Sequence, residues 1–99
     1  MEQENQTQEL EARFKKSADT LRKLAYRPSN DRLLKLYGLY KQATIGDVNI
    51  EMPDPLDLVA RAKFEAWQVQ NGVPPVKAML DYIELVEYLS SRPKQVVLE

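Results

Sequence analysis

The chain contains no cysteine and no histidine among its 99 residues. The lack of cysteine excludes disulfides and thiolate chemistry, and it fits a reducing compartment. The lack of histidine removes the commonest general base and the commonest protein ligand of zinc. Because a paired-carboxylate motif is also missing, the sequence predicts a protein that is not an enzyme and has no catalytic residues, no metal site and no cofactor.

Neither sign of charge dominates, since 14 lysines and arginines oppose 15 aspartates and glutamates and leave a formal net charge of −1. Such a balance provides no overall field to attract nucleic acid, although a local basic cluster can still bind a phosphorylated small molecule. No apolar run approaches the ~20 residues of a membrane-spanning helix, and the N-terminus lacks the basic and apolar regions of a signal peptide. We therefore expect a monomeric, cytoplasmic protein that binds no nucleic acid.

Helical periodicity runs through most of the chain, and the alternation typical of strands is missing. The length indicates one domain. We place this domain at residues 10–92, between a disordered N-terminus at residues 1–9 and a tail at residues 93–99. Four helices are predicted, and they span Leu10–Ala25, Asn30–Ile45, Pro55–Gln70 and Pro74–Ser91. The predicted fold class is therefore all-α, a four-helix bundle.

Residues that favour helix ends mark several of these boundaries. Ser29 or Asn30 is the expected N-cap of the second helix, and Asp54 is that of the third. Gly46 and Gly72 follow the second and third helices, where a residue in the left-handed conformation commonly closes a helix. The connections between the first and second helices and between the third and fourth are short, so the helices that they join should be antiparallel.

Apolar residues at helical spacing form one stripe on each predicted helix. The stripes are Leu10, Phe14, Ala18 and Leu21; Leu36, Leu39 and Ala43; Ala60, Phe64 and Trp67; and Val76, Met79, Ile83, Val86 and Leu89. The connection from the second to the third helix is long and contains two prolines. We expect its apolar residues Val48, Ile50 and Met52 to pack partly against the core.

One stretch of the second helix combines aromatic and basic side chains. Tyr37, Tyr40 and Lys41 lie at positions i, i+3 and i+4, so two phenols and an ammonium share a face, and Leu33 precedes them by one turn. Aromatic rings can stack on a base, phenols can donate hydrogen bonds, and lysine binds phosphate as a point charge. These residue types fit a ligand that is part aromatic and part phosphate. On spacing alone, the favoured interpretation is an ordinary half-buried helix with core tyrosines and a solvated lysine.

The same stretch, Tyr37-Gly-Leu-Tyr-Lys-Gln-Ala-Thr-Ile-Gly-Asp47, resembles the signature Tyr-x-x-Tyr-Lys-Gln-Ala-Thr-x-Gly-Asp of the acyl-CoA-binding protein family. Ala60-Arg-Ala-Lys-Phe-Glu-Ala-Trp67 is similar to the family's Gly-Lys-Ala-Lys-Trp-x-Ala-Trp. Ala78-Met-Leu-Asp-Tyr-Ile-Glu-Leu-Val86 is similar to its Ala-Met-x-x-Tyr-Ile-x-x-Val. The three segments occur in the same order, so the resemblance covers nearly the whole domain.

The resemblance implies a bundle of up-down-down-up arrangement that binds medium- and long-chain fatty acyl-CoA esters non-covalently. Such a protein is a carrier and pool former that meets acyl-CoA-using enzymes and membranes transiently. The resemblance also implies a set of residues in contact with the ligand. They are Phe14, Ala18, Arg22, Leu33, Leu34, Tyr37, Tyr40, Lys41, Lys63 and Tyr82.

Each of these residues has an implied role within the resemblance. Tyr37, Lys41 and Lys63 would contact the 3′-phosphate region of the CoA ribose. Tyr40 would lie against the adenine, with Leu33 and Leu34 lining the same site. Arg22 would supply a further positive charge to the phosphates, Phe14 and Ala18 would line the acyl channel, and Tyr82 would close the site from the fourth helix.

Four departures from the family pattern concern ligand affinity and chain preference. Val59 occupies a position where many members carry lysine, Phe64 replaces a tryptophan, and Ala60 replaces a glycine. Pro53-Asp54-Pro55 replaces a Pro-Gly turn in the connection before the third helix. The alternative function is a helical protein-interaction module that has lost its ligand. The retained Lys41 and Lys63 argue against it, because a decayed site would lose a charge first. An enzyme acting on a thioester would need a nucleophile or an activated water that the sequence lacks.

Overall fold

The computed structural model describes residues 2–91, with side chains from residue 6 onward. Its helices are α1 (Glu2–Arg22), α2 (Asn30–Thr44), α3 (Leu58–Gln68) and α4 (Pro75–Ser91). Within residues 2–91 there is no strand, so the all-α prediction is confirmed. Residues 93–99, which the sequence predicts to form a tail, lie outside the described residues.

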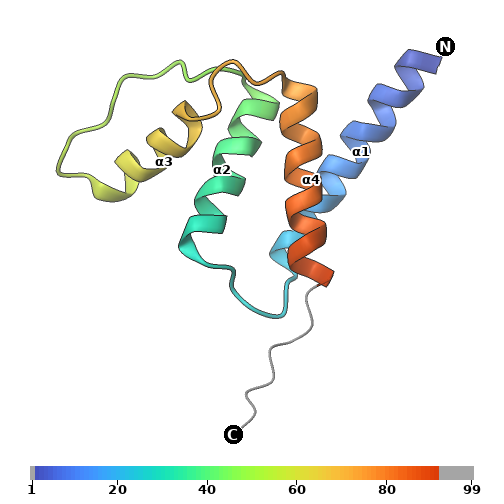
Figure 1. Cartoon of the computed structure of the whole chain (residues 1–99), viewed down its shortest axis with the longest axis horizontal. Coiled ribbons are helices and arrows are strands. Elements are labelled where there is room, and N and C mark those ends of the chain that lie inside the picture. Colours follow the sequence, from blue (N-terminus) through green and yellow to red (C-terminus); the bar gives the residue numbers. More distant parts are fainter. Residues whose placement is uncertain (1, 92–99) are drawn as a thin grey trace, which may run out of the picture.

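The four helices are arranged around α4 and α2. α1 packs on one side of α4 and α2 on the other, while α3 packs on the outer side of α2 (Figure 1). α2 and α3 run in one direction and α1 and α4 in the other, which confirms the up-down-down-up arrangement and both antiparallel pairs (Figure 1). Among the described residues, the helix pairs in close backbone contact are α1 with α4, α2 with α3 and α2 with α4. α1 and α2 therefore face each other through side chains alone.

The ends of α2 and α4 agree closely with the predicted boundaries. Ser29 is the N-cap of α2, because its side-chain oxygen accepts a hydrogen bond from the backbone N–H of Arg32 at 3.2 Å. Gly46 and Gly72 adopt positive φ angles of 101° and 87° after α2 and α3, as the helix-closing prediction requires. The α4 helix begins at Pro75, where a missing N–H is tolerated because the first turn has no partner for it.

The boundaries of α1 and α3 differ from the prediction. α1 begins at Glu2 instead of Leu10, because the Glu- and Gln-rich start has good helix propensity even without an apolar stripe. The helix thus runs through the segment predicted to be disordered, and the domain limits themselves remain predictions. α3 begins at Leu58, not Pro55, and its N-cap is Asp57, which accepts from the N–H of Ala60. Asp54 instead accepts from the N–H of Leu56 within a preceding turn.

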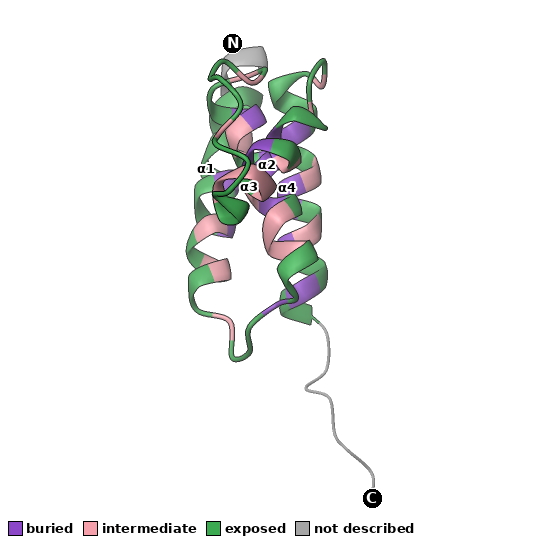
Figure 2. Cartoon of the chain, turned by 90° about the vertical axis from the view of Figure 1, so that its left-hand side faces the viewer, coloured by how far each residue is buried: buried purple, intermediate pink, exposed green. Residues whose placement is uncertain are grey.

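The core lies where α1 and α2 meet α4 (Figure 2). Its buried members are Phe14, Leu36, Leu39, Ala43, Ala78, Tyr82, Ile83, Val86 and Leu89. One apolar prediction was wrong, because Val76 is exposed on α4. On the α2–α3 connection Val48 is half-buried, whereas Ile50 and Met52 are exposed. The buried stripe of α4 includes Ala78 and Tyr82 instead, because neighbours cover this helix on two sides.

A close backbone crossing joins α3 to α2. A Cβ atom on Gly38 would lie 2.2 Å from the carbonyl oxygen of Ala66, so only glycine allows this approach. Trp67 and Phe64 are both buried residues of α3. The indole N–H of Trp67 donates a hydrogen bond of 2.7 Å to the carbonyl of Gly46. The crossing and this bond therefore fix α3 against both the middle and the end of α2.

A polar clamp formed by Gln42, Asp47, Asn71, Gly72 and Val73 ties the end of α2 to the α3–α4 connection. The side-chain amide of the buried Gln42 donates to Asp47 Oδ1 at 2.9 Å and to the carbonyl of Val73 at 2.8 Å. The N–H of Gly72 also donates to Asp47 Oδ1, at 2.8 Å. Asn71 Oδ1 accepts from the N–H of Val48 at 3.0 Å. Gln42 and Asp47 of the signature stretch therefore have a structural role that requires no ligand.

The clamp predicts a loss of stability in acid. The hydrogen bonds from Gly72 and then Gln42 lower the pKa of Asp47 below its ordinary value of 3.8. A depressed folded-state pKa contributes stability that is present above the unfolded pKa and is lost as pH falls through the folded one. We expect Asp47→Asn to lower the urea midpoint at pH 7 and to flatten its decline below pH 4. Glu51→Gln, an exposed charge on the same connection, is the control, and an equal effect of both changes would contradict the prediction.

Candidate functional site

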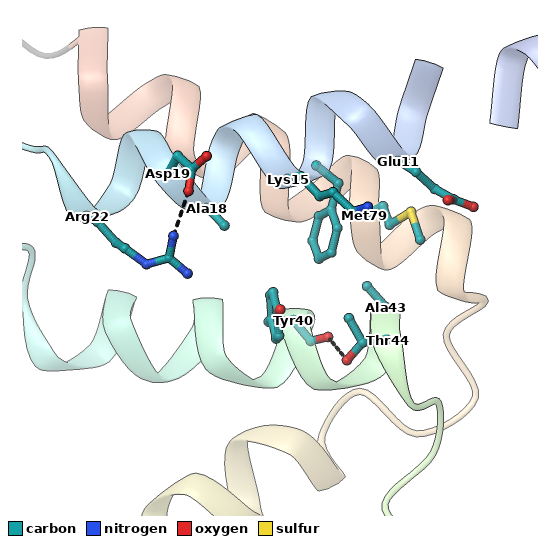
Figure 3. A pocket seen from close by; sticks show the side chains of 10 residues that line it. Glu11, Lys15, Ala18, Asp19, Arg22, Tyr40, Ala43, Thr44 and Met79 are labelled. Atoms are coloured by element: carbon teal, nitrogen blue, oxygen red, sulfur yellow. Dashed lines mark hydrogen bonds and ion pairs between the residues drawn. The ribbon is translucent and has the colours of Figure 1, made fainter. Parts of the chain in front are cut away.

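Two surface cavities border α2, one on each side. The α1/α2 cavity has a volume of about 520 Å³, and the α2/α3 cavity has a volume of about 470 Å³. The first is lined by Glu11, Phe14, Lys15, Ala18, Asp19, Arg22, Tyr40, Ala43, Thr44 and Met79. The second is lined by Arg27, Asn30, Leu33, Leu34, Tyr37, Leu58, Val59, Ala62 and Lys63. Figure 3 shows the first cavity, with side chains of α1 pointing toward Tyr40 and Thr44 of α2.

Phe14 and Tyr40 line the α1/α2 cavity, and Tyr82 packs against both rings to form an aromatic cluster. The Phe14 and Tyr40 rings stack with centroids 5.3 Å apart, and the Phe14 and Tyr82 rings meet edge to face with centroids 5.0 Å apart. Tyr40 is 42 % exposed, whereas Tyr82 is only 3 % exposed. The Tyr40 ring is therefore partly exposed to the cavity, whereas Tyr82 packs against it from the core.

Burial shifts the pKa of Tyr82. Desolvation, followed by the neighbouring Tyr40 phenol, raises the pKa of Tyr82 above its ordinary value of 10.0, while Arg22 acts weakly in the opposite direction. The phenol thus stays protonated at neutral pH. The family resemblance predicts that Tyr82 closes the site from the fourth helix, and in the structure Tyr82 is a buried member of the core that packs against Tyr40.

The ammonium groups of Lys41 and Lys63 both lie near the Tyr37 ring. Lys41 Nζ of α2 lies 5.8 Å from the ring centroid, and Lys63 Nζ of α3 lies 5.5 Å from it. Lys41 Nζ is also 5.4 Å from the Trp67 ring. Aromatic faces attract cations, so the Tyr37 ring helps to hold both ammonium groups on this side of α2 and the Trp67 ring helps to hold that of Lys41.

Neither of these ammonium groups forms an ion pair with the described part of the chain. Within residues 6–91, the ion pairs of this structure involve Arg13, Arg22, Arg61 and Lys77, and neither Lys41 nor Lys63 has a carboxylate within 4.0 Å. Two cations near one ring, without a carboxylate partner among residues 6–91, favour the binding of an anion at this side of α2. A phosphate group is such an anion and offers several acceptor oxygens.

The ten residues predicted for the site fall into three groups in space. Phe14, Ala18, Arg22, Tyr40 and Tyr82 belong to the α1/α2 cavity and to the aromatic cluster beside it. Leu33, Leu34, Tyr37 and Lys63 line the α2/α3 cavity. Lys41 lies over the rings of Tyr37 and Trp67, which come from different helices. The structure thus brings all ten onto the two sides of α2, while Tyr37 and Tyr40 face different cavities.

The prediction missed several residues that line these cavities. Lys15 and Met79 belong to the α1/α2 cavity, and Arg27 and Asn30 belong to the α2/α3 cavity. Lys15 follows the buried Phe14 directly, so its position at the edge of that stripe was a usable signal. Arg27 lies in the α1–α2 connection, where helical periodicity gives no information.

The comparisons with known proteins give one consistent result. Residues 11–86 match the family model described as acyl CoA binding protein. The chain belongs to the acyl-CoA-binding protein family. The acyl-CoA-binding protein of Dictyostelium discoideum is 40 % identical over 79 residues, which cover 80 % of this chain and 94 % of the relative.

The family fold is also seen in solved structures. Acyl-CoA-binding protein 2 of Oryza sativa superimposes with a TM-score of 0.81 at 38 % identity, covering 84 % of this chain and 90 % of that chain. The acyl-CoA-binding protein of Moniliophthora perniciosa gives a TM-score of 0.75 at 30 % identity, covering 83 % and 84 %.

The described residues contain neither a membrane-spanning helix nor a cluster of metal-binding side chains. No helix within residues 2–91 is long and apolar enough to cross a membrane. The same residues hold no group of three or more histidine, cysteine, aspartate or glutamate side chains placed to bind a metal ion. The candidate site therefore consists of aromatic, aliphatic and basic side chains around α2.

Proposed function

We propose that this member of the acyl-CoA-binding protein family binds medium- and long-chain fatty acyl-CoA esters non-covalently and serves as their cytoplasmic carrier and pool former. The observation that carries the proposal is that the ammonium groups of Lys41 and Lys63, which have no carboxylate partner among residues 6–91, both lie near the Tyr37 ring. This cationic site adjoins a cavity whose other walls are largely aliphatic.

The three chemical parts of an acyl-CoA match different parts of this surface. The 3′-phosphate carries about two negative charges near neutral pH, which suit Lys41, Lys63 and the Tyr37 hydroxyl. The adenine is flat and suits the exposed ring of Tyr40. The hydrocarbon chain suits apolar walls. Those of the α2/α3 cavity come from Leu33, Leu34, Leu58, Val59 and Ala62.

Val59 has a place in this proposal. It lines the α2/α3 cavity at a position where the family resemblance places a lysine in many members. The exchange removes one positive charge and adds a branched apolar wall. Contacts with the hydrocarbon chain should therefore contribute a larger share of the binding affinity, and contacts with charged groups a smaller share.

The proposal is for a binding protein, with no chemical step. Thioester hydrolysis needs an activated nucleophile or water, and the chain offers neither cysteine nor histidine for this purpose. We propose a monomer that meets membranes and acyl-CoA-using enzymes transiently. Following free thiol during incubation with palmitoyl-CoA tests the absence of chemistry, and steady thiol release would indicate an enzyme instead.

Calorimetric titration with palmitoyl-CoA, free CoA and palmitate tests the function. A buried CH₂ contributes about 0.8 kcal/mol, so a long chain offers on the order of 10 kcal/mol before the costs of binding are subtracted. We expect palmitoyl-CoA to bind more tightly than free CoA by several orders of magnitude, and palmitate to bind weakly because it lacks the phosphates. Equal affinities for palmitoyl-CoA and CoA would contradict the proposal that apolar cavity walls bind the hydrocarbon chain. Failure of all three to bind would favour a protein-interaction module.

A further inference from the structure

The α1 side of the α1/α2 cavity carries charges of alternating sign. Glu11, Lys15, Asp19 and Arg22 all line this cavity, and their spacing of four, four and three residues places them along one face of α1. Two acids and two cations thus face the space beside Tyr40. This wall is neutral overall, in contrast to the Lys41–Lys63 site on the other side of α2.

Arg22, the last charged residue of this row, already forms an ion pair with Asp19. Arg22 Nη1 lies 2.6 Å from Asp19 Oδ1 in a charge-assisted hydrogen bond, drawn in Figure 3. The side chains are 72 % and 63 % exposed, respectively. An ion pair this exposed is weak and can exchange partners. A ligand phosphate that binds Arg22 through Nη1 must therefore displace Asp19 from that atom.

We infer that Asp19 is a specificity-determining residue that holds Arg22 until an anionic ligand displaces it and so keeps ligand affinity below its attainable value. The inference rests on the proposed function, since it concerns the same site. Asp19 acts through Arg22, because it competes with phosphate for the guanidinium. The competition weakens binding of anions at this wall and leaves apolar contacts with Phe14 and Ala18 unaffected.

The test measures palmitoyl-CoA binding by Asp19→Asn at low and high salt. Exposed ion pairs are worth about 0.2–1 kcal/mol, so we expect roughly a two- to fivefold gain in affinity at low ionic strength. Salt screens exposed charges, and the screening length falls to about 3 Å at 1 M salt. The gain in palmitoyl-CoA affinity should therefore disappear near 0.5 M salt. Asp19→Glu, which retains the carboxylate, should keep the wild-type affinity.

Asp81→Asn is the matched control. Asp81 pairs with Lys77 on α4 at 3.0 Å, away from both cavities, and its loss changes the net charge by the same amount. An equal gain in both variants would mean that net charge alone acts, and it would overturn the inference. In an Arg22→Gln background, Asp19→Asn should give no gain, and a persisting gain would also overturn it.

These outcomes separate the inference from the function on which it rests. If wild-type protein binds palmitoyl-CoA and Asp19→Asn binds no more tightly than Asp81→Asn, the role of Asp19 is wrong and the proposed function stands. If wild-type protein does not bind palmitoyl-CoA, the proposed function is wrong and the role of Asp19 falls with it.

Discussion

Gly38→Ala is expected to destabilise the protein and to weaken palmitoyl-CoA binding at the same time. Alanine in a helix interior is normally more favourable than glycine by roughly 0.5–1 kcal/mol. Here the new Cβ would lie 2.2 Å from the Ala66 carbonyl oxygen and 2.7 Å from its carbon, and neither backbone atom can rotate away. The two helices must move apart, and overpacking of this kind costs about 1–3 kcal/mol.

Binding should fall because α3 carries Lys63, which would retreat from Tyr37 and Lys41. Urea unfolding followed by circular dichroism measures the stability, and calorimetry measures the affinity. Gly72→Ala is the control: a Cβ there meets no atom within 4 Å, but the φ of +87° strains the new residue. It should lose stability and keep its affinity. Unchanged stability and binding in Gly38→Ala would show that the two helices can separate without cost.

Lys41→Ala is expected to reduce the affinity for palmitoyl-CoA by roughly ten- to a hundredfold. Hydrogen bonds to charged groups contribute about 1.5–3 kcal/mol, and Lys41 has no carboxylate partner within residues 6–91 that already uses its charge. The loss should be smaller with palmitoyl-dephospho-CoA, which lacks the 3′-phosphate. Calorimetry with both ligands measures the difference.

Lys35→Ala is the matched control for this change. Lys35 is an exposed lysine of the same helix, but it lies beside Tyr88 and Asp81 on the face of α2 that borders α4. The Lys35→Ala variant loses the same charge as Lys41→Ala, and Lys35 lines neither the α1/α2 cavity nor the α2/α3 cavity. Equal losses in Lys41→Ala and Lys35→Ala would assign the effect to general electrostatics and would contradict a specific phosphate contact.

The sequence predicted the helices well where apolar spacing and end signals coincide. α2 and α4 have both, and their boundaries agree within one or two residues. α1 has a polar beginning with no stripe, so its first turns were missed. At α3, Asp54 and Asp57 are both good N-caps, and propensity cannot choose between them. Asp54 instead closes a turn around Pro55, which moves the start of the helix to Leu58.

The site was predicted by composition better than by geometry. Positions three apart on a helix differ by about 60° around its axis. Tyr37 and Tyr40 therefore look like neighbours in the sequence and yet turn toward different helices. Which helices stand on either side of α2 is a property of packing, which periodicity does not contain. The contribution of Gly38 likewise depends on Ala66, a residue of another helix.

The attachment of α3 has a consequence for how the domain opens. Among the described helices, α3 packs on α2 alone, while α1, α2 and α4 share the larger core. A segment with one neighbour separates at a lower free energy than the whole domain unfolds, so opening is local. A ligand that joins Lys63 of α3 to Lys41 of α2 adds a second attachment at this point. Binding should then slow amide exchange in α3 far more than in the other helices, and release of the ligand requires only one hinged helix to move, with the rest of the fold intact.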